Sequence, residues 1–243
     1  MMWEITFLPS SKMPDYDFPL KDRFEVAEGT MAFVFETSSD FTFRAGQYVE
    51  VFLKNAPYKD EKKDHRDFSI TSSPQDKGIL MVATRMTGSA FKRSFAEVPI
   101  GTISKIEGPF GDFGLHENPN RKAVLIAGGI GITPLRSIIK DATERKLPHK
   151  ITLIYSNRNK EGAPFLKDLE GWERENPNFK LCPRMTDKEG HVDADFIKKS
   201  SGDLANTTFY MVGPLGMVAA MAKLLEELKI SRDDMRFEEF SGY

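Results

Sequence analysis

A glycine-rich segment, LIAGGIGITPLRS at residues 125–137, has the residue types needed to bind an anion. An apolar run enters it and an amphipathic stretch leaves it, so we expect a strand, a tight turn and a helix that begins at Thr133. The free N–H groups of such a helix suit a pyrophosphate. A plain strand-to-helix turn is the alternative, because Pro134 occupies the third position of the Gly-x-Gly-x-x-Gly pattern. The residues concerned are Gly128, Gly129, Gly131, Thr133 and Pro134.

Two further strand ends carry polar or glycine residues. YSNR closes the next apolar run with Ser156 and Arg158, a hydroxyl and a cation suited to a 2′-phosphate. No acid sits at that strand end to pair with a free ribose hydroxyl, so the pattern predicts NADPH rather than NADH. An ordinary exposed arginine is the alternative for Arg158. VGPLGM places Gly213, Pro214 and Met217 at another such turn, where core filling is the alternative for Met217.

The segment HRDFS at residues 65–69 places a cation, a ring and a hydroxyl on one short strand. Residues two apart share a face of a strand, so Arg66 and Phe68 point one way and Ser69 the other. A barrel-core phenylalanine and a surface arginine are the alternative. A helix start at Ser89 offers a second set of free amides, and two such sites call for two phosphate groups.

The two halves of the chain have different apolar patterns. Up to about residue 115, short runs alternate in polarity, as in QYVEVFL at 47–53, which is typical of antiparallel strands and favours a barrel. Only SAFKRSFAEV at 89–98 indicates a helix there. From residue 121, apolar runs alternate with amphipathic stretches, which predicts a parallel α/β sheet. We therefore expect domains at 1–117 and 118–243.

Composition excludes several classes of protein. Lysine and arginine total 34 against 36 acidic residues, so nothing favours nucleic acid or an anionic membrane as a partner. The single cysteine, Cys182, excludes an intrachain disulfide and a four-cysteine metal site and suits a reducing compartment. The histidines lack metal-ligand spacing, so no metal site is assigned. With no secretory signal and an apolar run of only 123–132, we expect a cytoplasmic monomer that does not span a membrane.

Taken together, the motifs RDFS, GPFGDF, GGIGITP, VGPLGM and a C-terminal FEEF resemble, in this order, those of the ferredoxin–NADP reductase-like flavoproteins. The resemblance covers nearly the whole chain. It implies a flavin-binding antiparallel barrel followed by an NAD(P)-binding α/β domain, with FAD as the flavin.

The resemblance also implies roles for individual residues. Arg66 would pair with the flavin pyrophosphate, Phe68 would pack on the isoalloxazine, and Ser69 would bind near flavin N5. Glu238 and Phe240 would form a Glu-x-aromatic pair whose ring covers the other flavin face. The remaining residues assigned to the flavin are Thr84, Gly88, Ser89 and Ala90.

Three positions depart from the family pattern. Phe68 stands where the family often has tyrosine, so one hydrogen bond to the flavin is lost. Val212 replaces the cysteine that plant-type members carry beside the nicotinamide. The chain continues past Phe240 as SGY, so either Phe240 or Tyr243 could shield the flavin.

The expected activity is that of an FAD-dependent NAD(P)H oxidoreductase, in which hydride passes from nicotinamide C4 to flavin N5. The acceptor would be a separate molecule such as a ferredoxin, a flavodoxin or a small molecule. Two alternatives stay open: an NAD(P)H:flavin reductase that uses free flavin as a substrate, and an electron-transfer subunit of a larger complex.

Overall fold

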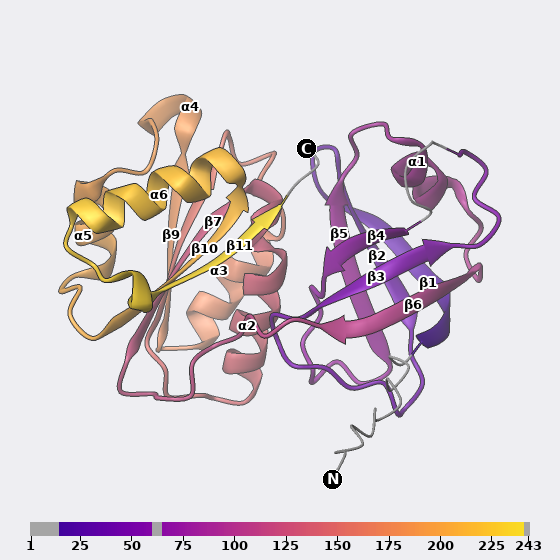
Figure 1. Cartoon of the computed structure of the whole chain (residues 1–243), viewed down its shortest axis with the longest axis horizontal. Coiled ribbons are helices and arrows are strands. Elements are labelled where there is room, and N and C mark those ends of the chain that lie inside the picture. The colour runs from indigo at the N-terminus through magenta and orange to yellow at the C-terminus, as the bar shows by residue number, and fades with distance from the viewer. Residues whose placement is uncertain (1–14, 60–64, 241–243) are drawn as a thin grey trace, which may run out of the picture.

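The computed structural model describes residues 15–59 and 65–240, and for residues 239 and 240 only the backbone. Its strands form two sheets, one in each half of the chain (Figure 1). The first half contains β1 (Asp15–Ala27), β2 (Thr30–Glu36), β3 (Tyr48–Leu53), β4 (His65–Ser69), β5 (Ile79–Arg85), α1 (Ala90–Glu97) and β6 (Ile103–Phe110). The second half contains β7 (Lys122–Gly128), α2 (Ile132–Glu144), β8 (Ile151–Asn157), α3 (Leu166–Glu175), β9 (Phe179–Met185), α4 (Thr186–Glu189), α5 (Ala194–Ser201), β10 (Thr207–Pro214), α6 (Leu215–Glu227) and β11 (Met235–Phe240), with short 3₁₀ turns at Gly129–Gly131 and Arg232–Asp234.

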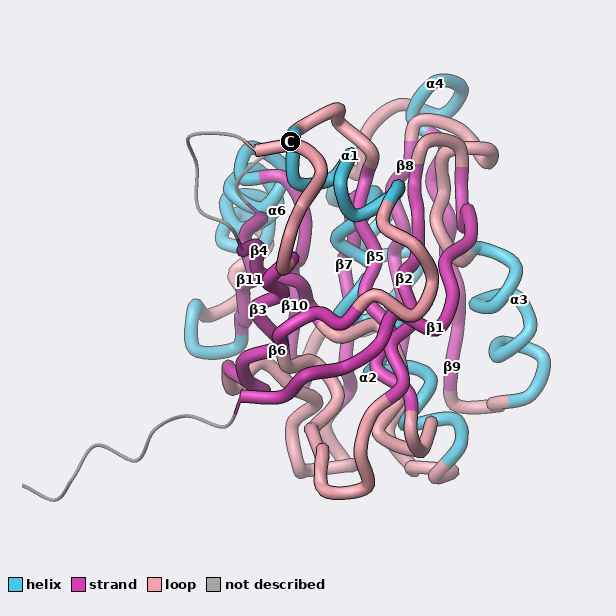
Figure 2. The backbone as a smooth tube through the Cα atoms, turned by 90° about the vertical axis from the view of Figure 1, so that its right-hand side faces the viewer, coloured by secondary structure: helices cyan, strands magenta, loops and turns pink. Residues whose placement is uncertain are grey.

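The first sheet is antiparallel, in the order β4-β3-β6-β1-β2-β5, and curves into a barrel that faces the viewer in Figure 2. Its two edge strands meet just beyond β4, where the Thr71 N–H donates to the Met81 carbonyl at 2.7 Å. Alternating polarity fixes the strand faces, so Val49, Val51 and Leu53 are buried in the barrel. Helix α1 packs on the same core, which confirms the predicted barrel and, within the described part of this half, its single helix.

The second sheet is parallel, in the order β11-β10-β7-β8-β9. One face packs against α2 and α3 and the other against α5 and α6, so the apolar run of β7 is buried on both faces. The chain crosses from one side of β7 to the other, and ligands bind at the carboxyl ends of strands at such a switch point. Among the described residues, no helix is both long and apolar enough to cross a membrane.

The two domains share a packed interface. Ala32, Met81 and Ala83 of the barrel belong to the same apolar cluster as the residues of α2 and α3. The buried Arg136 donates from Nη1 to the Thr71 carbonyl at 2.7 Å, with its guanidinium lying over the rings of Phe165 and Trp172. Ser137 donates to the Ser72 carbonyl at 2.6 Å. These contacts hold the carboxyl edge of the parallel sheet beside the barrel, while the domain boundary at residues 117 and 118 stays a prediction.

Candidate functional site

Ser69 and Glu238, which lie 169 residues apart, meet between the domains. Ser69 ends β4 of the barrel and Glu238 lies in β11 of the parallel sheet. The buried Ser69 hydroxyl donates to Glu238 Oε1 at 2.8 Å. Glu238 Oε2 is buried and has no hydrogen-bond partner among the described residues.

The environment of Glu238 favours its protonated form. Burial raises the pKa of Glu238 to about 7, and the hydrogen bond from Ser69 only partly opposes this effect. A carboxyl group with a pKa near 7 can hold or release a proton under ordinary conditions. Oε2 of Glu238 is therefore available to hydrogen-bond a ligand that carries a polar atom on a ring.

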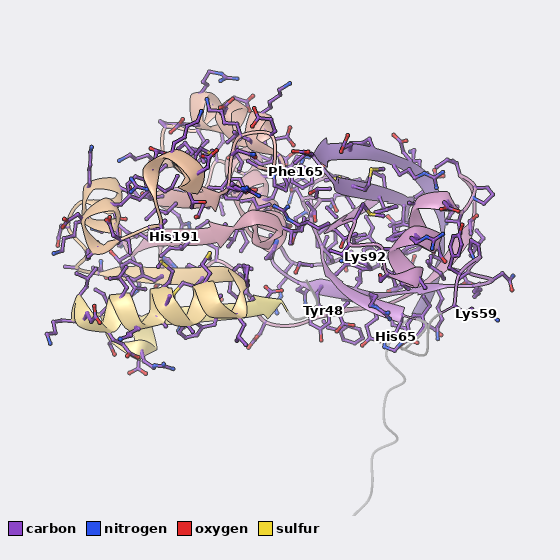
Figure 3. All side chains as sticks on the ribbon, turned by 90° about the horizontal axis from the view of Figure 1, so that it is seen from above. Tyr48, Lys59, His65, Lys92, Phe165 and His191 are labelled. Carbon is purple, nitrogen blue, oxygen red and sulfur yellow. The ribbon has the colours of Figure 1, made fainter. Side chains whose placement is uncertain are left out.

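Tyr48 belongs to the same site, although the sequence analysis missed it. In the register of β3 and β4 it lies directly opposite Ser69, and Figure 3 shows it near the end of β11, between the domains. Burial raises the pKa of Tyr48, and the nearby carboxylates of Asp67, Glu50 and Glu238 raise it further, so the phenol is neutral. The sequence placed Tyr48 in a strand, but only the pairing with β4 reveals its neighbour.

Phe68 points away from this pair. Its side chain is 7% exposed and lies in the barrel core, with ring centroids 6.1 Å from Phe91 and 5.9 Å from Phe95 of α1. The structure thus shows the core packing that was the alternative interpretation, and stacking on a flavin stays a prediction. Arg66, on the same side of β4, has its guanidinium over the Phe91 ring at 5.2 Å.

The start of α1 gathers positive charge. The helix starts at Ser89, as predicted, and the Ser89 hydroxyl caps it by accepting from the Lys92 N–H at 3.3 Å. Burial lowers the pKa of Lys92, and the nearby Arg66 cation lowers it further. Gly88 has φ +76°, and a Cβ at this position would meet nothing within 4 Å, so the space beside this turn is open. Sequence reasoning missed Lys92, because nothing in the pattern of α1 distinguishes it from a solvent-exposed lysine.

Other residues assigned to the flavin are placed but not tested. Ala90 is the first residue of α1, directly after the cap. Thr84 is buried in β5 and donates weakly to the Arg85 carbonyl at 3.4 Å. Their flavin contacts stay predictions.

The glycine turn differs from expectation in how its helix begins. Gly131, not Thr133, is the cap residue, because a 3₁₀ turn over Gly129–Gly131 leads straight into α2 at Ile132. Thr133 lies inside the first turn and donates to the Ile130 carbonyl at 3.0 Å. Pro134 follows it, also within the first turn, where a backbone N–H has no helical partner to lose. In this first turn the Ile132 N–H already donates to the carbonyls of Gly129 and Ile130, and Pro134 has no N–H, so the turn offers fewer free amides than the sequence predicted.

Gly131 is required by the protein's own packing, whereas Gly128 lies against the flexible end of Met217. A Cβ on Gly131 would lie 2.4 Å from the Val212 carbonyl oxygen, and one on Gly128 would lie 2.3 Å from Met217 Sδ. Met217 thus packs on the turn, as its core-filling interpretation predicts. Gly129 has φ +54°, and a Cβ there would lie 3.2 Å from the guanidinium of Arg85. Arg85, from the barrel, brings a cation to the turn that the sequence analysis missed.

The neighbouring strand ends lie where they were predicted. Ser156 pairs with Gly128 in the register of β7 and β8, and Arg158 follows β8 with an exposed side chain. The expectation of no acid at this edge is incomplete, because the Asp187 N–H donates to the Arg158 carbonyl at 3.1 Å. Asp187 follows β9, so only the strand order brings it here.

The last turn and the C-terminal aromatic are described in part. Gly213 and Pro214 end β10, and the backbone of Phe240 pairs with Pro214. The side chain of Phe240 and all of Tyr243 lie outside the described residues, so the choice between the two rings stays open.

Comparison with known proteins agrees with this two-domain arrangement. A family described as Oxidoreductase FAD-binding domain matches residues 17–114, and one described as Oxidoreductase NAD-binding domain matches residues 125–223. The chain belongs to the ferredoxin–NADP reductase-like flavoprotein oxidoreductases. Its barrel is therefore an FAD-binding domain and its parallel sheet an NAD-binding domain, as predicted.

Individual relatives of this flavoprotein are distant. Flavohemoprotein A of Dictyostelium discoideum is 23% identical over 92% of this chain and 60% of its own. Terephthalate 1,2-dioxygenase reductase component 1 of Comamonas sp is 29% identical over 69% of this chain and 48% of its own. The chain thus spans about half the length of these relatives. The FAD/NAD-binding domain of nitric oxide dioxygenase from Vibrio cholerae has the same fold, with a TM-score of 0.81 and 17% identity over 92% of this chain and 98% of its own.

Proposed function

We propose that this chain is an FAD-dependent NAD(P)H oxidoreductase that passes electrons to a separate acceptor. The observation that carries the proposal is the buried Ser69–Glu238 hydrogen bond, which joins the FAD-binding barrel to the carboxyl edge of the NAD-binding sheet. It lies where two ligands, one from each domain, can meet. The family relationship supports the same conclusion.

The residues present fit FAD in two places. The buried and unpartnered Oε2 of Glu238, with the phenol of Tyr48 nearby, offers polar contacts to an isoalloxazine edge. Arg66 and Lys92 place two cations near the start of α1, where the turn beside Gly88 leaves open space. Two close cations repel each other, and a diphosphate between them would relieve that repulsion. We therefore assign the ring to the first place and the diphosphate to the second.

The protein's contribution to the reaction is alignment and proton control. When bound, FAD accepts a hydride at N5 from C4 of the reduced nicotinamide and releases electrons to the acceptor. Ser69 orients the Glu238 carboxyl group, and burial keeps its pKa near neutrality so that it can hold or exchange a proton at Oε2. The packed domain interface fixes the two binding sites relative to each other, which lowers the entropic cost of bringing two reactants together.

The dinucleotide would lie along the turn between β7 and α2. The Arg85 guanidinium beside Gly129, together with the positive end of the α2 dipole, suits its pyrophosphate. Arg158 and Ser156 support NADPH as the donor. NADH is the competing choice, because the hydrogen bond from the Asp187 N–H to the Arg158 carbonyl brings an acidic residue to this edge. Phe240, or Tyr243 beyond it, would cover the second flavin face and move aside for the nicotinamide.

The acceptor is a ferredoxin, a flavodoxin or a small molecule, and the protein acts as a monomer. Its location is the cytoplasm, because a single cysteine suits a reducing compartment. The rival interpretation, a reductase of free flavin, predicts a colourless purified protein that turns over added riboflavin. Absorbance of the purified protein and identification of the released chromophore test the choice. Stoichiometric FAD supports the proposal, and a protein that retains no flavin contradicts it.

A further inference from the structure

An acidic pair lies across two strands of the barrel. Glu50 of β3 and Asp67 of β4 are directly opposite each other, and His65 lies two residues before Asp67 in β4, on the same face. The Nε2 atom of His65 is 3.7 Å from Glu50 Oε2. One ligand atom from each of the three side chains lies within 4.8 Å of the others. Figure 3 shows His65 at the outer edge of the barrel, away from the second domain.

The strand pairing holds the two carboxylates together, although their like charges destabilise the sheet. Like charges directly opposite each other on neighbouring strands destabilise a sheet. On its other side Glu50 faces Glu107 of β6, whose carboxylate is already bound to Lys105 at 2.5 Å. The Lys105 ammonium group is thus bound to Glu107 on β6, the strand next to Glu50. The His65 ring packs on Phe52 with centroids 4.5 Å apart, which limits its rotation and keeps Nε2 toward Glu50.

The dimensions match those of a first-row transition metal. Bonds of about 2.1 Å from Zn²⁺ to nitrogen and oxygen place two ligands of a tetrahedron about 3.4 Å apart. The His65–Glu50 distance of 3.7 Å is close to that value. An imidazole among the ligands selects Zn²⁺, Co²⁺ or Ni²⁺ over Mg²⁺ and Ca²⁺, which prefer oxygen alone.

We propose that Glu50, His65 and Asp67 bind one Zn²⁺-class divalent metal ion, with water in the remaining position. No pattern in the sequence indicates such a site, because its ligands lie on two strands and are adjacent only through the register of β3 and β4. The ion would stabilise the pairing of the two strands that carry Tyr48 and Ser69. It would do so without contacting Arg66 or Phe68, which point to the other side of β4.

Titration of the tag-free full-length protein with Zn²⁺ by calorimetry, and with Co²⁺ by its visible absorption, tests the site. We expect one equivalent to bind, with millimolar Mg²⁺ unable to compete. Glu50→Gln, His65→Gln and Asp67→Asn should each weaken binding roughly tenfold or more, since even the hydrogen-bond partners of metal ligands matter by about that factor. Flavin content and the urea midpoint of each variant show that the fold is retained.

Matched controls come from the same chain. Asp17→Asn removes a barrel carboxylate that is paired with Lys54 at 2.7 Å, and His191→Gln removes an exposed histidine of the second domain. Neither should change the affinity. Absence of stoichiometric binding would overturn the proposal. Binding that survives all three ligand substitutions, or that the controls weaken equally, would overturn it as well.

Discussion

Replacing Glu238 by glutamine should change how stability depends on pH. Glutamine keeps an oxygen that can accept from Ser69 but cannot ionise. In the wild type, burial raises the pKa of Glu238 from 4.5 to about 7. A group whose pKa is raised on folding stabilises the protein fully below its unfolded pKa, and that stability is lost as the pH rises through the folded pKa.

The size of the effect follows from the shift. One pKa unit corresponds to about 1.4 kcal/mol, so a rise from 4.5 to about 7 corresponds to about 3 kcal/mol between the extremes of pH. Most of this change in the free energy of unfolding occurs between about pH 5 and pH 8, and partial exposure of Glu238 reduces the change to about 2 kcal/mol. As the pH rises from about 5 to about 8, the free energy of unfolding of the wild type should therefore fall by about 2 kcal/mol relative to that of Glu238→Gln.

Urea unfolding of the flavin-free proteins, followed by tryptophan fluorescence, measures the difference. Other titrating groups contribute equally to both proteins and cancel in the comparison. Glu227→Gln, which alters an exposed carboxylate on α6, should follow the wild type at every pH. Parallel pH profiles for wild type and Glu238→Gln would refute the reasoning, because they would show that Glu238 titrates alike in the folded and unfolded chain.

Four further outcomes are expected. Arg158→Ala should raise KM for NADPH much more than for NADH, and an equal loss would remove the 2′-phosphate assignment. Lys92→Met should weaken FAD binding roughly tenfold in a fluorescence titration without lowering stability, since it deletes a cation already disfavoured by burial; unchanged affinity would place the diphosphate elsewhere. Arg136→Met should cost about 2 to 3 kcal/mol in urea unfolding, because a charged hydrogen bond to Thr71 and two ring contacts are lost; a smaller cost would mean that the interface does not depend on it. Removing residues 240–243 should speed flavin reduction or alter coenzyme choice in stopped-flow measurements, and unchanged kinetics would show that the tail does not gate the site.

Patterns local in sequence predicted local structure well. Alternation over 47–53 and an apolar run over 123–127 identified a barrel strand and a buried parallel strand, because burial on one or both faces of a strand dictates those patterns. A helix start at Ser89 was correctly expected, and Ser89 caps α1 in the structure. The cap of the helix after the glycine turn was placed two residues late, at Thr133 instead of Gly131, because no side-chain pattern in the sequence indicates the 3₁₀ turn that precedes the helix.

Contacts between distant segments could not be predicted in this way. Whether Arg66 and Phe68 face a ligand or the core depends on where α1 packs, and the structure places Phe68 in the core. Arg85 reaches the glycine turn only because the barrel docks on α2. Ser69 and Glu238 were assigned through the family resemblance, and only the packing of both domains creates the buried environment that raises the pKa of Glu238.

The most direct test of the account is anaerobic mixing of the purified yellow protein with NADPH and with NADH while the flavin absorbance is followed. The account predicts that bound FAD is reduced by a nicotinamide at a catalytically competent rate, and more efficiently by NADPH. A bound flavin that stays oxidised in the presence of both would contradict the proposal that the site between Ser69, Glu238 and the glycine turn joins the two cofactors.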